Sequence, residues 1–167
     1  MIPHDEIVTI VDIDNNVTGS EYRSKMRISR LIHRATFIFV TNSDNNIFVQ
    51  KRSKTKDLYP GFYDITTGGV VLADESYEES AKREVYEELG IQNVPMQSLF
   101  DFYYSSVMNN VWGRVFECSF DGHIILQKEE IESGQFYHVE EIETLIKKEP
   151  VTPESVYVFN RWRSKSF

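Results

Sequence analysis

Apolar and polar positions alternate in short, β-branched runs along the first part of the chain. The run at 7–13 ends in an Asp-Asn-Asn segment and predicts a strand followed by a turn. Two further runs, 35–41 and 47–52, flank an Asn-rich segment and predict a β-hairpin. A strand at 62–66 should lead into two consecutive glycines. The interval 20–30 has only a weak pattern, which fits a connecting segment or a short helix.

A helical period replaces the alternation between residues 77 and 89. Every fourth position is apolar, which makes a stripe that can face a core. The stripe consists of Tyr77, Ala81, Val85 and Leu89. Ser76 followed by Glu79 fits a capping box at the start of this helix, and Gly90 fits the left-handed position just past its end.

The remaining patterns complete an alternation of strands and helices. They predict strands at 97–106, 111–120 and 135–138, a helix at 139–148, and a final helix that Thr152 caps and that runs from Pro153 through Trp162. One helix between two groups of strands, with further helices at the end, fits a three-layer α/β arrangement. No internal repeat or linker interrupts the sequence, so we expect one domain over residues 1–167.

The composition narrows the class of protein. An apolar content of 41% is too high for a disordered chain. A net charge of −8 disfavours a nucleic-acid-binding protein, which usually carries a positive face. No apolar run is long enough to span a membrane. Cys118 is the one cysteine and lies between phenylalanines, which predicts a buried thiol in a protein of the reducing cytoplasm.

The strongest chemical signal is a group of three glutamates on the helix at 77–89. At about 100° per residue, Glu84, Glu87 and Glu88 fall within an arc of roughly 100°. Glu88 borders the apolar stripe and should be partly buried. Like charges four residues apart destabilise a helix by about 0.2–0.5 kcal/mol, and burial raises that cost. A hard divalent cation such as Mg²⁺ would reverse it. The alternative is a solvated helix face, which is the better interpretation of other glutamates on this helix.

The surroundings of these glutamates decide between the two interpretations. Residues 69–91 match the pattern Gly-x5-Glu-x7-Arg-Glu-apolar-x-Glu-Glu-x-Gly-apolar at every position. The segment resembles the signature of the Nudix hydrolase family. The resemblance implies the Nudix fold, an α/β fold in which a mixed β-sheet is sandwiched between helices and 69–91 forms a loop–helix–loop. It also implies hydrolysis of a diphosphate bond in a nucleoside diphosphate derivative or related small molecule, with Mg²⁺ or Mn²⁺.

The same resemblance assigns roles within residues 69–91, which we call the Nudix box. The expected metal ligands are Glu84, Glu87, Glu88 and, through its carbonyl, Gly69. One of the three glutamates would act as the base that takes a proton from the attacking water. Arg83 belongs to the catalytic group as the cation that pairs with these carboxylates, and it should orient the helix and loop together with Glu75. Gly90 has the structural role of ending the helix.

Basic residues before the box are the candidate substrate contacts. In Nudix proteins an arginine in this place often contacts substrate phosphates, which implies Arg52 and, more weakly, Lys56; a guanidinium can grip phosphate through two hydrogen bonds. The alternative is a solvated basic edge that protects a strand from aggregation. Some family members take a glutamate from the region of Glu129, Glu130 and Glu132, which leaves Glu130 open, although solvated loop charge is the simpler interpretation. His33 fits a structural role better than a substrate contact.

The part before the box resembles the branch close to isopentenyl-diphosphate isomerase. The cysteine of that enzyme type is missing, because Gly68-Gly69-Val70-Val71 stands in place of its Cys-Gly-His-Pro segment. We therefore expect a hydrolase, with an isomerase and a diphosphate-binding module without turnover as the alternatives. The partner should be a small-molecule diphosphate rather than nucleic acid or membrane, and the sequence does not decide between a monomer and a homodimer. An aromatic set could stack on a base, although core packing explains it better: Phe102, Tyr103, Tyr104 and Trp112.

Overall fold

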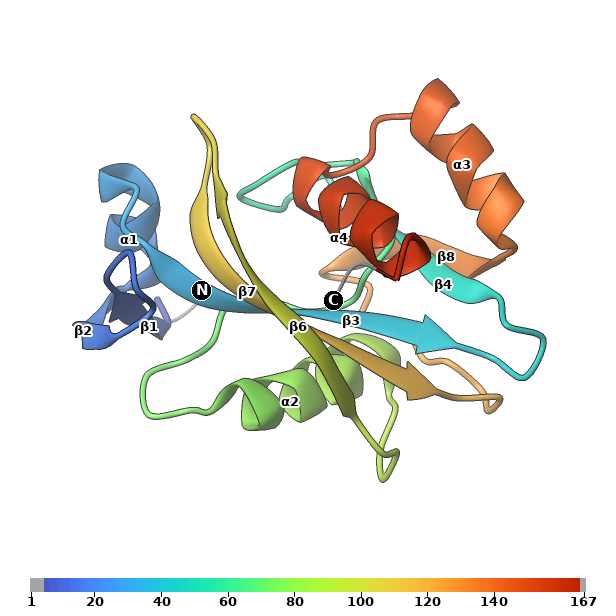
Figure 1. Cartoon of the computed structure of the whole chain (residues 1–167), viewed down its shortest axis with the longest axis horizontal. Coiled ribbons are helices and arrows are strands. Elements are labelled where there is room, and N and C mark those ends of the chain that lie inside the picture. Colours follow the sequence, from blue (N-terminus) through green and yellow to red (C-terminus); the bar gives the residue numbers. More distant parts are fainter. Residues whose placement is uncertain (1–4, 166–167) are drawn as a thin grey trace.

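Helices cover both faces of a mixed, twisted sheet in the computed structural model, which describes residues 5–165. Figure 1 shows α2 below the sheet and α3 and α4 above it. The strands are β1 (Ile7–Val11), β2 (Val17–Tyr22), β3 (His33–Thr41), β4 (Ile47–Arg52), β5 (Tyr63–Asp64), β6 (Gln97–Ser105), β7 (Asn110–Ser119) and β8 (Ile131–Tyr137). The helices are α1 (Arg23–Ser29), α2 (Tyr77–Leu89), α3 (Val139–Lys148) and α4 (Pro153–Arg163). The predicted α/β sandwich is confirmed.

The sheet is parallel at its centre and antiparallel at its flanks. β3 pairs with β7 in parallel from His33↔Val111 to Thr41↔Ser119, and β6 lies antiparallel to β7. β4 pairs antiparallel with β8. The predicted hairpin of β3 and β4 is confirmed only at its turn, because the two strands pair at Thr41↔Ile47 and then separate. The segment after β5 lies along β3 instead, through the bridges Ile38↔Thr67 and Ala35↔Val70.

Two apolar clusters explain why the sheet needs helices on both faces. Ile38 of β3 packs with Val85 and Leu89 of α2. The next residue, Phe39, points to the other face and packs in the cluster that contains Ile142 of α3 and Phe159 of α4. Successive strand residues point to opposite faces, so one strand feeds both clusters.

The sequence predicted most elements within one or two residues, and the differences have a common cause. β2 was missed and β8 begins at Ile131 rather than 135, because their polar residues are largely exposed and give no apolar alternation. β5 covers two residues of the five predicted. The short-helix alternative for 20–30 is correct, as α1. Within the described residues, no helix is both long and apolar enough to cross a membrane.

Candidate active site

Helix α2 is fixed by its own sequence, and this sets the direction of its glutamates. The Ser76 side chain accepts the Glu79 amide, the Glu79 carboxylate accepts the Ser76 amide, and Gly90 ends the helix at φ 70°. Tyr77, Ala81, Val85 and Leu89 are all buried, as predicted for the apolar stripe. With that stripe against the sheet, the glutamates that follow it in the helical period lie along its border.

The three glutamates do not share one environment. Glu84 and Glu88 are 9% and 5% exposed, whereas the Glu87 side chain is 47% exposed. Gln50 of β4 donates to Glu88 at 3.2 Å. Burial raises the pKa of both Glu84 and Glu88; the charge of Glu87 raises the pKa of Glu84 further, and the charge of Glu84 does the same for Glu88. Two adjacent buried carboxylates are therefore held close together at a cost that a cation would remove.

Arg83 ties these carboxylates to the loop before the helix. Its guanidinium donates to both oxygens of Glu75 at 2.7 and 3.0 Å, to Glu84 at 2.8 Å and to Glu87 at 3.2 Å. It also donates to the Val70 carbonyl at 3.2 Å. The contacts are of the kind that the orienting roles of Arg83 and Glu75 require. One guanidinium sets the position of the loop and of two helix glutamates.

Two glycines let the backbone pass between β3 and the glutamates. Gly68 has φ +146°, and a Cβ there would lie 2.1 Å from the Thr36 carbonyl oxygen. A Cβ on Gly69 would lie 2.5 Å from Glu84 Oε1. The Gly69 carbonyl accepts the Thr36 amide at 2.9 Å, while no described residue donates to the Gly68 carbonyl. The Gly69 backbone thus lies against the Glu84 carboxylate, and Gly69 as a metal ligand stays a prediction.

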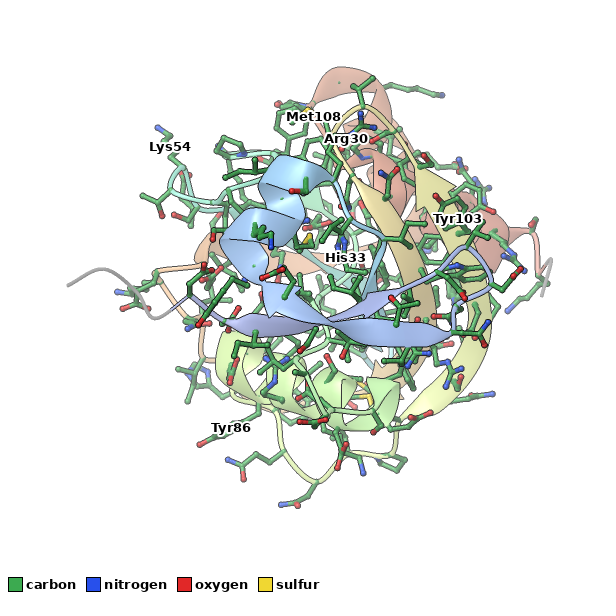
Figure 2. The ribbon with its side chains drawn as sticks, turned by 90° about the vertical axis from the view of Figure 1, so that its left-hand side faces the viewer. Arg30, His33, Lys54, Tyr86, Tyr103 and Met108 are labelled. Carbon is green, nitrogen blue, oxygen red and sulfur yellow. The ribbon has the colours of Figure 1, made fainter. Side chains whose placement is uncertain are left out.

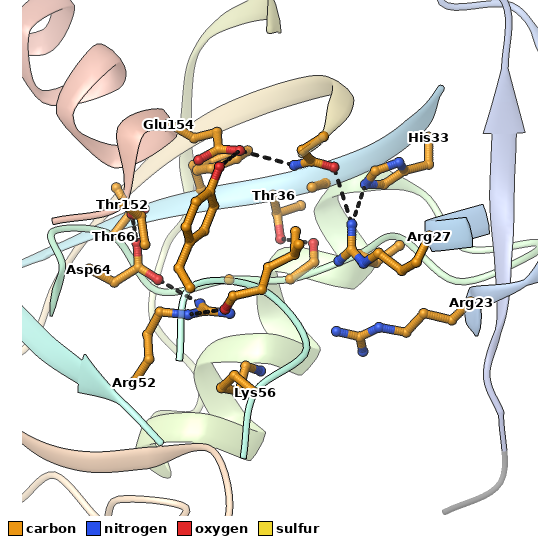
Figure 3. A pocket seen from close by; sticks show the side chains of 18 residues that line it. Arg23, Arg27, His33, Thr36, Arg52, Lys56, Asp64, Thr66, Thr152 and Glu154 are labelled. Carbon is orange, nitrogen blue, oxygen red and sulfur yellow. Dashed lines mark hydrogen bonds and ion pairs between the residues drawn. The ribbon is translucent and has the colours of Figure 1, made fainter. Parts of the chain in front are cut away.

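A cleft with a basic wall opens from these glycines. Arg52 and Lys56, the two predicted substrate contacts, both line it (Figure 3). Arg52 donates to Asp64 at 2.8 Å and to the Leu58 carbonyl at 3.1 Å. Lys56 forms an ion pair with Glu130, and its charge also acts on Glu84 and Glu88. The cleft thus places both cations next to the acidic residues of α2.

No sequence pattern indicates the residues that complete this wall. Arg23 and Arg27 of α1 line the cleft together with Asn109 and Glu154. Arg27 donates to the side-chain oxygen Oδ1 of Asn109 at 3.1 Å, and the side-chain nitrogen Nδ2 of Asn109 donates to Glu154 at 3.1 Å. These four residues come from three distant parts of the chain, and no local spacing predicts that they meet.

The other candidates are buried or lie elsewhere. His33 lines the cleft behind α1 but is only 1% exposed (Figure 2), and burial and the charge of Arg27 lower its pKa to about 4. Cys118 is buried in the cluster under α2, and burial raises its pKa to about 12. The cleft is not lined by any of the four aromatic residues singled out in the sequence; Phe37 and Tyr59 line it instead. Glu132 lies in β8 rather than in a loop.

Comparison with known proteins gives consistent matches. The family model described as NUDIX domain matches residues 31–160. The chain is 42% identical over 161 residues to a Nudix hydrolase of Yersinia pestis, covering 96% of this chain and 87% of the relative. It is 40% identical to the Nudix hydrolase YfcD of Escherichia coli K12, covering 96% and 88%. The crystal structure of DR0079 from Deinococcus radiodurans is similar at a TM-score of 0.82 and 25% identity, covering 93% and 98%.

Proposed function

The chain belongs to the Nudix hydrolase family, and on that premise we propose that it is a metal-dependent hydrolase that cleaves a diphosphate bond in a nucleoside diphosphate derivative or a related small molecule. One observation carries the proposal. The buried carboxylate of Glu84 lies against Gly69, which lines a cleft that Arg52 and Lys56 also line, and the charge of Lys56 acts on both Glu84 and the buried Glu88. A diphosphate needs both features, since cations must balance its charge and oxygen ligands must hold a metal beside it.

The donor set fits Mg²⁺ or Mn²⁺, which prefer oxygen ligands. Glu84 and Glu88 would hold the ion, with Glu87 joining them when it leaves Arg83, and with a carbonyl from Gly68 or Gly69. Within residues 5–165 no three acidic, histidine or cysteine side chains already form a metal-binding group, and Glu84 and Glu87 are both paired with Nη1 of Arg83. A bound ion supplies Lewis acidity that activates water and neutralises phosphoryl oxygens.

Residues of the chain would then position the ligands, accept the proton and stabilise the developing charge. Arg83 keeps Glu84 in place against the loop. A glutamate of the Nudix box that does not hold the ion would take the proton from the attacking water. Arg52 stabilises the charge that develops on phosphoryl oxygens, because its guanidinium is already fixed by Asp64. Lys56 contacts phosphate by exchanging Glu130 for it.

The two alternative functions fit the geometry less well. An isomerase of the type that uses a cysteine would need a thiol in the cleft, and Cys118 is instead 3% exposed in the apolar core. A binding module without turnover would not need a possible base beside the metal. We further expect a cytoplasmic protein that acts on a small molecule.

A substrate screen with a matched pair of variants tests the proposal. Nucleoside diphosphates, triphosphates, sugar nucleotides, dinucleotides and coenzyme A are incubated with Mg²⁺ or Mn²⁺, with and without EDTA. EDTA should abolish turnover, and Glu88→Gln should lower kcat by about 10²–10³-fold. Glu78→Gln is the control, because Glu78 lies on the same helix with a 52% exposed side chain paired to Arg114. Turnover that survives both EDTA and Glu88→Gln would refute the proposal.

A further inference from the structure

Three arginines that line the cleft are each held in the same way. Arg23 pairs through Nε with Asp57 at 3.3 Å and through Nη1 with Glu6 at 2.9 Å. Arg27 donates from Nε to Asp57 at 3.0 Å and from Nη1 to Asn109 at 3.1 Å. Arg52 donates from Nε to the Leu58 carbonyl and from Nη1 to Asp64. In each case Nε and Nη1 of the guanidinium have acceptors.

The remaining nitrogen, Nη2, is left for a ligand in all three. Across residues 5–165 no residue accepts a hydrogen bond from Nη2 of Arg23, Arg27 or Arg52. No buried side-chain nitrogen in that part of the chain lacks a partner, so these atoms have accessible surface. Since the three side chains line one cleft (Figure 3), they offer oriented donors to an anion inside it.

The charge of this wall also favours an anion. Among the described residues, four cationic side chains line the cleft against two acidic ones, Asp64 and Glu154. Asp57 is shared by Arg23 and Arg27, and Arg23 also pairs with Glu6. The pKa of Arg27 is lowered, first by burial and also by the charges of Arg23 and Arg52. Of the acids on this wall, Asp64 is paired with Arg52, and Glu154 accepts from Asn109. Lys56, paired with Glu130, adds a fourth cation to the lining.

Two of the three arginines come from outside the matched family region. The family match begins at residue 31, whereas α1 spans Arg23–Ser29. Arg52 lies within the match, and Arg23 and Arg27 precede it. The family match therefore covers one of these guanidiniums, and α1 supplies the other two.

We propose that Arg23 and Arg27 bind a phosphate monoester of the substrate, beyond the diphosphate bond that is cleaved and that Arg52 contacts. The inference rests on the proposed function and narrows its substrate class to diphosphates that carry one further phosphate. A phosphate monoester carries nearly two negative charges near pH 7 and three acceptor oxygens, which match the separate guanidinium donors of Arg23 and Arg27. That phosphate can be the end of a polyphosphate chain or a substituent on a sugar.

Two pairs of substrates distinguish these sources. NADPH and NADH differ by one phosphate on a ribose. ATP and ADP-ribose share ADP, but ATP carries a terminal phosphate where ADP-ribose carries a sugar. The protein should show at least about tenfold higher kcat/KM for the phosphate-bearing member of one pair, and that pair identifies the source. The Arg23→Gln/Arg27→Gln variant should lower this ratio by about 10-fold or more, since a hydrogen bond to a charged group contributes about 1.5–3 kcal/mol.

The matched control is Lys25→Gln. Lys25 lies on the same helix, carries the same charge and is 64% exposed in a pair with Glu21, away from the cleft. Its substitution should leave the ratio within about twofold. The proposal is wrong if neither pair shows a preference, or if the double variant lowers kcat/KM equally for both members of a pair, because the arginines would then serve the shared diphosphate or the fold. If the double variant does not fold, Arg23→Gln alone is measured by the same ratio.

A binding measurement separates this inference from the proposed function. Inorganic phosphate is added to the metal-free protein and the thermal midpoint is followed. The unmodified chain and Glu88→Gln should be stabilised, and the double arginine variant should lose most of the shift. A shift that depends on the arginines without hydrolysis of any substrate would keep the anion site and reject the hydrolase. Equal shifts in the unmodified chain and the double variant would reject the anion site even if hydrolysis is found.

Discussion

The acidic residues of the loop and helix at 69–91, which we call the acidic wall, and the basic wall of the cleft are built in opposite ways. The acidic wall comes from one continuous segment, in which Arg83 contacts Glu75, Glu84 and Glu87. The basic wall is assembled from α1, β4 and the loops around them, and its arginines are held by several acceptors from different parts of the chain. The positions of several acidic side chains therefore depend on Arg83, whereas in the basic wall one arginine can be substituted without displacing the rest. Stability should be concentrated in the first, and substrate selection in the second.

The largest expected effect on stability follows from Arg83. Arg83→Ala leaves Glu84 and Glu75, with side chains 11% and 13% exposed, without their cation. Unpairing a buried ion pair costs roughly 3–5 kcal/mol, and protonation of Glu84 should limit the loss here to about 2–4 kcal/mol in the free energy of unfolding. Urea unfolding of the metal-free protein near pH 8 measures it.

Arg23→Gln provides the contrast in the basic wall. Arg23 is 29% exposed and its acceptors Glu6 and Asp57 are 44% and 39% exposed, so solvent replaces the lost contacts. The expected cost is below about 1 kcal/mol. Equal losses for the two substitutions would remove the distinction between the walls.

The same contrast decides how much the sequence could predict. The acidic wall was predictable because the caps, the apolar stripe and the motif lie within residues 69–91 and act through local geometry. Even there, the helical arc grouped Glu87 with two residues that prove far more buried, because an angular position says nothing about depth. The basic wall depends on the parallel pairing of β3 with β7 and on the place of α4, which bring Asn109 and Glu154 beside α1. No local sequence pattern predicts that these residues lie together, because only the tertiary fold brings them close.

Gly69 tests how closely the acidic wall is fitted. In Gly69→Ala the new methyl group would lie 2.5 Å from Glu84 Oε1, so the carboxylate must move. A displacement of about 1 Å in a catalytic group can cost roughly 10²-fold, and we expect kcat to fall by about 10–100-fold while the chain still folds. Gly19→Ala is the control, because a Cβ on Gly19 meets nothing within 4 Å. Full activity of Gly69→Ala would show that Glu84 need not stay where it is.

The smallest effect is the pH dependence of the metal-free protein. Glu84 and Glu88 have pKa values raised above the ordinary 4.5, mainly by burial, so the folded state holds protons that the unfolded state has lost. Their contribution to stability is complete below the unfolded pKa and is lost as pH rises through the folded values. The comparison is made from pH 7 to pH 9, above the range in which His33, with its pKa lowered to about 4, would act in the opposite direction.

Across that interval the thermal midpoint should fall by roughly 2–4 °C, which corresponds to about 1 kcal/mol for a chain of this size. Glu88→Gln should flatten the dependence, because one of the two coupled carboxylates can no longer ionise. Mg²⁺ at pH 9 should restore the midpoint, since a cation stabilises the ionised pair in the folded state only. A midpoint that rises from pH 7 to pH 9 would mean that the two carboxylates are already compensated by the basic wall, and the two sides of the cleft would then form one electrostatic unit rather than two.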